Sequence, residues 1–144
     1  MKHKKIAFSI AITLALTTGA TTHSGATGPT LVRMNAMSQV QTAVKQLKLA
    51  LASPKSNGPQ INEAFNKLRT FGEELPQLFK TEHMTSMSEA SPTIWSEPDD
   101  FGIEIEVYNN QIEQAVEMID SNPNAIMKVI AKSCQSCHTK FREK

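Results

Sequence analysis

The sequence has little of what non-helical small folds need. Of its 144 residues, two are cysteine, six are glycine and 6% are aromatic. Two cysteines are too few for a disulfide scaffold of this length, and the scarcity of glycine and aromatic residues argues against a β-sandwich or barrel. The net charge is +1 with 20% charged residues, which excludes a disordered tail and a polybasic nucleic-acid binder. A single helical domain remains.

The first residues have the layout of a secretory signal peptide. A basic stretch, 1–5, precedes an apolar run, 6–16, which small residues follow. We predict a signal peptide over 1–20, with cleavage after Ala20 or as late as Ala26. The run is short for a bilayer span, and a retained membrane anchor is the alternative. We therefore expect a protein of the bacterial periplasm, without stable membrane insertion after cleavage.

Hydrophobic spacing in the remaining chain predicts helices and no strand. The expected helices cover about 30–52, 62–79, 99–120 and 124–144, with proline-containing breaks between them. The segment 80–98 is an irregular connector. The economical architecture for the domain, residues 30–144, is all-α: an antiparallel up-down-up-down four-helix bundle.

Two helices have recognisable faces. The first carries an apolar stripe with the spacing of a bundle seam, formed by Met37, Val40, Val44, Leu47 and Leu51. Acidic residues of the third are expected together on its solvated face: Glu104, Glu106, Glu113 and Glu117.

The fourth helix contains Cys134-Gln135-Ser136-Cys137-His138, the attachment pattern of a c-type haem. Each thiol would add to one haem vinyl group, and His138 would ligate the iron from the proximal side. Positions i, i+3 and i+4 share one face of a helix, so all three side chains can reach one porphyrin edge. The sequence therefore predicts a bundle with one covalently attached haem c.

Other uses of the two cysteines fit less well. A thioredoxin-like dithiol opens a helix after a strand, and no strand is expected here. A zinc site needs a fourth ligand, whereas His23 and His83 are isolated in polar segments. A disulfide between Cys134 and Cys137 would be awkward inside a regular helix.

The haem motif is followed by Phe141-Arg142, and three further stretches accompany it: Pro92-Thr-Ile-Trp95 before Phe101, Leu75-Pro76-Gln-Leu-Phe79, and Arg33 with Met37. On these residues the chain resembles the class II c-type cytochromes, the family of cytochrome c′ and the low-spin cytochromes c-556. The resemblance covers residues 31–144. It implies a haem motif near the C-terminus of a four-helix bundle.

Met37 is the candidate sixth iron ligand. It lies about seven residues from the start of its helix, and His138 about six from the end of its own, roughly 10 and 9 Å along antiparallel helices. The resemblance implies a ligand at the position of Met37 in c-556 types and a packing side chain over an open iron face in c′ types. A core role is the alternative for Met37, and Met34 is a weaker candidate ligand.

The connector end of the bundle supplies the other candidate pocket residues. Trp95, Phe79 and Phe101 can form the walls of a haem pocket. Arg33 precedes Met37 by one turn, so it either meets a haem propionate or is a solvated arginine at a helix start. Arg142 is either near the proximal face, as the resemblance implies, or a frayed terminal charge.

Two functions remain open. The first is single-electron transfer between periplasmic redox proteins, by a low-spin iron that His138 and Met37 ligate. The second is a five-coordinate module that binds or scavenges nitric oxide or carbon monoxide. No acid or base is evident beside Met37, so we expect no enzyme. A homodimer is a candidate assembly, because family members often pair through their first two helices, and no nucleic-acid partner is expected.

Overall fold

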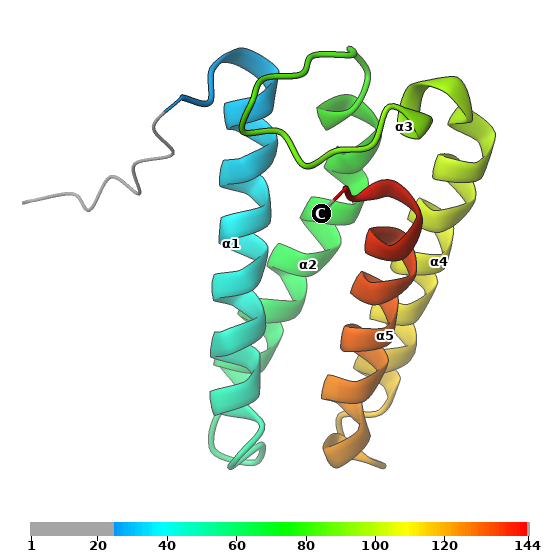
Figure 1. Ribbon diagram of the computed structural model, residues 1–144. Coiled ribbons are helices and arrows are strands. Elements are labelled where there is room, and N and C mark those ends of the chain that lie inside the picture. The colour runs from blue at the N-terminus through cyan, green and yellow to red at the C-terminus, as the bar shows by residue number, and fades with distance from the viewer. Residues whose placement is uncertain (1–24, 144) are drawn as a thin grey trace, which may run out of the picture.

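The computed structural model describes residues 25–143 (Figure 1). The predicted signal peptide over 1–20 lies outside these residues. The helices are α1 (Gly28–Ala50), α2 (Gly58–Leu78), α3 (Thr93–Ser96), α4 (Pro98–Glu117) and α5 (Pro123–Phe141). The four long helices alternate in direction, and α3 is a single turn within the connector. The prediction of an all-α, antiparallel four-helix bundle is confirmed.

Proline starts every long helix of the bundle. Pro29, Pro59, Pro98 and Pro123 each lie in the first turn, where the missing N–H has no intrahelical partner to lose. The second helix consequently begins at Gly58, four residues before the expected start, because Pro59 belongs to the helix and not to the break. None of the helices described is long and apolar enough to cross a membrane.

The helices pack as an open series. α1 packs on α2, α2 on α4 and α4 on α5, while α3 packs on the start of α4. In the described chain no comparable pairing joins α1 to α5, although Figure 1 shows them on the same side of the bundle. The two helices that carry Met37 and His138 are therefore the first and last members of the series.

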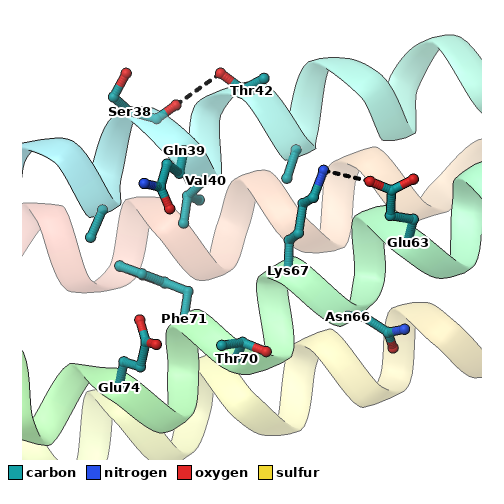
Figure 2. A pocket seen from close by; sticks show the side chains of 12 residues that line it. Ser38, Gln39, Val40, Thr42, Glu63, Asn66, Lys67, Thr70, Phe71 and Glu74 are labelled. Atoms are coloured by element: carbon teal, nitrogen blue, oxygen red, sulfur yellow. Dashed lines mark hydrogen bonds and ion pairs between the residues drawn. The ribbon is translucent and has the colours of Figure 1, made fainter.

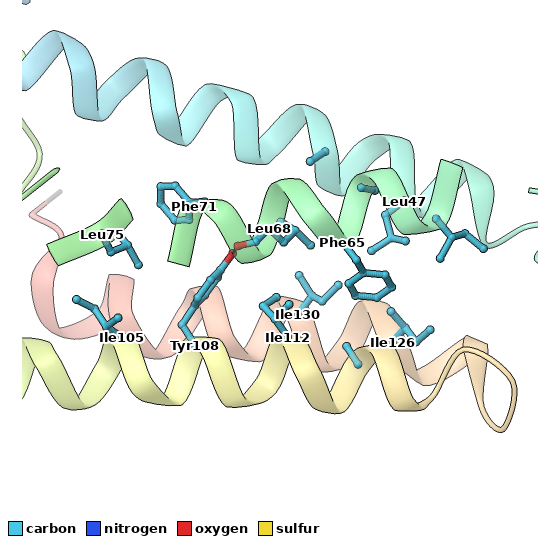
Figure 3. Packing of buried hydrophobic residues seen from close by; sticks show 14 of the residues in the cluster. Leu47, Phe65, Leu68, Phe71, Leu75, Ile105, Tyr108, Ile112, Ile126 and Ile130 are labelled. Atoms are coloured by element: carbon cyan, nitrogen blue, oxygen red, sulfur yellow. Dashed lines mark hydrogen bonds between the residues drawn. The ribbon is translucent and has the colours of Figure 1, made fainter. Parts of the chain in front are cut away.

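One end of the core is sealed, and we call it the closed end. It lies beside the loops 51–57 and 118–122 and contains Leu47, Phe65 and Ile126 (Figure 3). These three side chains are 0%, 1% and 0% exposed, respectively. On α1 the most buried apolar residues are Ala43, Leu47 and Ala50, so the predicted stripe is rotated slightly, and its other members are half-buried.

A close approach joins α2 to α4 midway along the bundle. A Cβ atom at Gly72 would lie 1.9 Å from Asn109 Oδ1, so the glycine leaves the space that the Asn109 side chain of α4 occupies. The buried Tyr108 hydroxyl donates a hydrogen bond of 3.0 Å to the Leu68 carbonyl. These contacts hold α4 against α2, and α4 carries two residues of the site described below, Phe101 and Glu104.

Candidate functional site

The Cys-x-x-Cys-His sequence lies in the last turns of α5, which ends at Phe141. Cys134 and Cys137 are half-buried against the hydrophobic core, and neither forms a disulfide. His138 is exposed. The helix places two thiols and one imidazole on one face, as the spacing predicts.

Burial controls the protonation of these groups. It raises the pKa of the Cys134 thiol, and that of Cys137 to about 11, with the nearby Glu104 carboxylate contributing to the second shift. Thiols of this kind are unlike the low-pKa thiolates of dithiol oxidoreductases. Although His138 is exposed, partial desolvation by its neighbours lowers its pKa, with help from the charge of Arg142. A neutral imidazole has the lone pair that a metal ligand needs.

A buried carboxylate holds the turn that carries Cys137. Glu104 of α4 is 5% exposed and accepts hydrogen bonds of 2.7 Å from Ser136 Oγ and 2.5 Å from Lys140 Nζ. These bonds lower its pKa, so it is ionised. The expectation of a solvated face is therefore wrong for Glu104, although Glu106, Glu113 and Glu117 are exposed.

The sequence contained a signal for the burial of Glu104. It lies three residues after Phe101 and four before Tyr108, both buried, and so shares their face of α4. The spacing on one helix does not show which residues of another helix it will contact, so its partners Ser136 and Lys140 on α5 could not be predicted.

The predicted pocket aromatics form one cluster. The ring centroids of Phe79 and Phe101 are 5.1 Å apart, and those of Phe79 and Trp95 are 6.4 Å apart. Phe101 also packs edge-on against Phe141 of α5, at 5.2 Å. The Trp95 indole donates a hydrogen bond of 2.7 Å to the Phe79 carbonyl. The structure thus brings all three predicted aromatic residues together near the end of α5.

Arg33 is buried beneath the connector. Its side chain is 5% exposed, so the interpretation as a solvated arginine is wrong. The guanidinium lies 5.0 Å from the ring centroids of both Phe79 and Trp95. It donates hydrogen bonds to the carbonyls of Leu78 (2.8 Å), His83 (2.9 Å) and Thr81. These contacts fasten the start of the connector to α1, and a propionate contact stays a prediction.

A short backbone pairing ties the connector to the end of α5. Ala90 and Arg142 form an isolated antiparallel bridge. The Ser91 N–H donates to the Phe141 carbonyl at 2.9 Å, and the Glu143 N–H donates to the Glu89 carbonyl at 2.7 Å. Arg142 also forms an ion pair with Glu89, so it is not a frayed terminal charge.

Met37 faces inward on α1. It is half-buried and packs against the core, whereas the half-buried Met34 is not among the side chains packed there. It lies nine residues after the first residue of α1, and His138 lies three before the last residue of α5. The first helix begins at residue 28, before the expected residue 30, and the last helix ends at residue 141, before the expected residue 144. Figure 1 shows that α5 ends below the start of α1. Iron ligation by Met37 stays a prediction.

A groove of about 520 Å³ lies between α1 and α2, away from these residues. Val40 and Phe71 are among its apolar lining residues, and Glu63 and Lys67 form an ion pair beside it (Figure 2). None of the predicted haem-site residues lines this groove.

A family model described as cytochrome C′ matches residues 29–142. The chain belongs to the cytochrome c′ family. This finding confirms the resemblance to class II c-type cytochromes. Among curated proteins, no sequence matches this chain significantly.

Solved structures of cytochromes c′ and c556 have the same fold. A cytochrome c′ with an unusual ligand-controlled dimer dissociation has a TM-score of 0.66 at 15% identity, covering 83% of this chain and 99% of its own. A nitric oxide complex of a variant cytochrome c prime from Alcaligenes xylosoxidans has a TM-score of 0.51 at 22% identity, with coverages of 77% and 96%. Oxidized R. palustris cytochrome c556 has a TM-score of 0.51 at 23% identity, with coverages of 77% and 98%.

The cofactor of this cytochrome c′ family member is haem c, attached covalently. The donor set on α5 fits that group, because haem c needs two thiols and an imidazole at this spacing. In residues 25–143, no group of three His, Cys, Asp or Glu side chains is gathered to hold a bare metal ion. The half-buried thiols lie beside apolar side chains of the kind that a porphyrin contacts.

Proposed function

We propose that this chain is a periplasmic monohaem cytochrome that carries single electrons between redox proteins. Cys134 and Cys137 form the two thioether bonds, and His138 is the proximal iron ligand. The observation that carries the proposal is the placement of two free, half-buried thiols and an imidazole on one face of α5. When bound, the haem iron supplies one-electron exchange between its ferrous and ferric states.

The residues around the motif have separate tasks in this proposal. The cysteines hold the porphyrin edge against α5, and the imidazole of His138 provides a nitrogen for the iron. Phe79, Trp95 and Phe101 keep water from the pocket with their packed rings. A site that changes little between two oxidation states suits fast electron transfer, and the bonded connector provides such rigidity.

Attachment is tested by extraction of the haem from the denatured protein. Protein made with a c-type maturation system should stay coloured after denaturation and acid extraction. Replacing both cysteines by Cys134→Ala and Cys137→Ala should make the haem extractable. Release of haem from the unsubstituted protein would overturn the attachment at these residues.

Met37 is the proposed sixth ligand. A thioether is a soft ligand that suits haem iron, and the methionine side chain is unbranched and flexible. Two protein ligands in both oxidation states should give a low-spin optical spectrum. Met37→Ala should convert it to a high-spin spectrum and let carbon monoxide bind, while the matched control Met34→Ala should leave the spin state unchanged. A high-spin ferric spectrum of the unsubstituted protein would overturn the ligation.

Gas binding is the second candidate function. It is favoured by the fold similarity to nitric oxide complexes of a cytochrome c prime. In this case Met37 packs over an open iron face and does not ligate. Immediate binding of carbon monoxide by the unsubstituted ferrous protein would identify this function, whereas its exclusion would support electron transfer.

We also propose that two copies associate through α1 and α2. The groove between these helices is lined by apolar residues, among them Val40 and Phe71, and by the charged residues Glu63, Lys67 and Glu74. A structural neighbour is described as having a ligand-controlled dimer dissociation. Val40→Glu, in the groove, should give the sedimentation coefficient of a monomer. A dimer that persists in this variant would contradict the proposed interface.

Export is proposed from residues 1–20. Expression in a bacterium with the leader present should yield mature protein in the periplasmic fraction. Intact mass should place the new N-terminus after residue 20 or as late as after residue 26. A full-length chain in the membrane fraction would instead identify a retained anchor.

A further inference from the structure

One carboxylate near the attachment motif has an unusual position. Glu104 is 5% exposed although it is charged, while the other three glutamates of α4 are exposed. Burying a charge is costly unless partners compensate for it. The two partners of Glu104 are Ser136 and Lys140, both on α5.

These partners lie on either side of Cys137. Ser136 precedes the cysteine by one residue, and Lys140 follows it by three. A carboxylate from α4 that bonds to both therefore fixes the turn of α5 that carries the thiol.

The ion pair is asymmetric in its exposure to water. The Lys140 side chain is 55% exposed, whereas that of Glu104 is 5% exposed. Water screens the ammonium charge much more strongly than the buried carboxylate. The pair thus presents a residual negative charge to the interior beside Cys137.

We propose that Glu104 is a positioning residue for the haem-attachment turn and a fixed negative charge that lowers the reduction potential of the attached haem. This inference rests on the proposed attachment at Cys134 and Cys137. A nearby negative charge stabilises the more positive ferric state relative to the ferrous state, and hydrogen bonding and charge near a haem are levers on its potential. Lys140 opposes the effect from the solvent side.

The midpoint potential of the holoprotein tests the proposal. Glu104→Gln keeps an oxygen that can accept from Ser136 but removes the charge, so the potential should rise. Lys140→Gln removes the screening cation and leaves the carboxylate, so the potential should fall. Disruption of the turn alone would not give shifts of opposite sign. The control is Glu113→Gln on the same helix, whose carboxylate pairs with Arg69 of α2, and it should leave the potential unchanged.

Two results would overturn the inference: shifts of the same sign, or an unchanged potential in Glu104→Gln. If Glu104→Gln does not retain haem, Lys140→Gln decides alone, because a lower potential supports the inference and an equal or higher one refutes it. Failure of the proposed function is distinct. Extractable haem in the unsubstituted protein would refute the attachment, whereas unshifted potentials in coloured holoprotein would refute only the role of Glu104.

Discussion

The two ends of the bundle differ in how completely protein side chains seal them. At the closed end Leu47, Phe65 and Ile126 are at most 1% exposed. At the other end, Phe101 is 7% exposed, and Met37, Phe79, Trp95 and both cysteines are half-buried against the core. The same kind of amphipathic helix forms both ends, so helix pattern alone does not explain the difference. The less sealed end is the one that carries the haem motif.

Loss of haem should have the largest effect on stability, and it should destabilise the haem-motif end more than the closed end. Haem has more apolar surface than any one side chain, and a group bound to the native state stabilises it. Protein lacking haem, prepared by extracting the haem from the double cysteine-to-alanine variant, should melt at a clearly lower temperature than holoprotein. Hydrogen exchange should show the loss of protection in the connector and the last turns of α5 before the closed end.

The matched control keeps the cysteines. Unsubstituted protein produced without the maturation system also lacks haem, so it separates the effect of haem from that of the two substitutions. Equal melting temperatures for the apo and holo forms would show that haem adds nothing to the packing of this end.

A pair of phenylalanine truncations compares the ends directly. Phe65→Ala, at the closed end, should destabilise the protein by about 3–5 kcal/mol, since it leaves a cavity in a sealed core. This cost should be similar in the apo and holo forms. Phe79→Ala removes a half-buried ring that contacts Trp95 and Phe101, so its cost should be smaller overall and larger in holoprotein than in apoprotein. Urea unfolding of each variant in both forms measures these costs, and equal costs for Phe79→Ala in the two forms would contradict the contrast.

Arg33 should have the next largest effect, confined to the connector end. Arg33→Met leaves three carbonyls without their donor, one at the end of α2 and two in the connector, and should cost about 2 kcal/mol. Arg33→Lys keeps the charge but not the planar fork and should recover part of this cost. Urea unfolding gives the loss, and hydrogen exchange should place it in residues 78–83. Full recovery by lysine would mean that charge, and not the fork, holds the connector.

Sequence reasoning succeeded where the cause is local. Helical spacing predicted the four long helices, and the Cys-x-x-Cys-His spacing, complete within two turns, predicted covalent haem. Glu104 was misjudged, and the burial of Arg33 could not be decided, because their partners lie on α5 and in the segment 78–83, far away in sequence. Its charge favoured a solvated position for Glu104, but a residue three after Phe101 and four before Tyr108 shares their buried face of the helix. Pro59 was assigned to a break between helices. In the sequence alone, a proline in the first turn of a helix cannot be distinguished from a proline that ends the preceding helix.

The smallest effect on the free energy of unfolding is expected for an exposed ion pair midway along the bundle, away from both ends. Arg69 bonds to Glu113 through two contacts, 2.6 Å and 2.7 Å, which lower the pKa of the glutamate and raise that of the arginine. Both side chains are more than a third exposed, so Glu113→Gln should cost about 0.5 kcal/mol and at most about 1. The contribution should be complete above the ordinary pKa of glutamate and should disappear as the pH falls through the lowered value, because protonation removes the pair. Urea unfolding at neutral and acidic pH checks this, and a difference between variant and parent that persists in acid would show that Glu113 stabilises α4 by some means other than its charge.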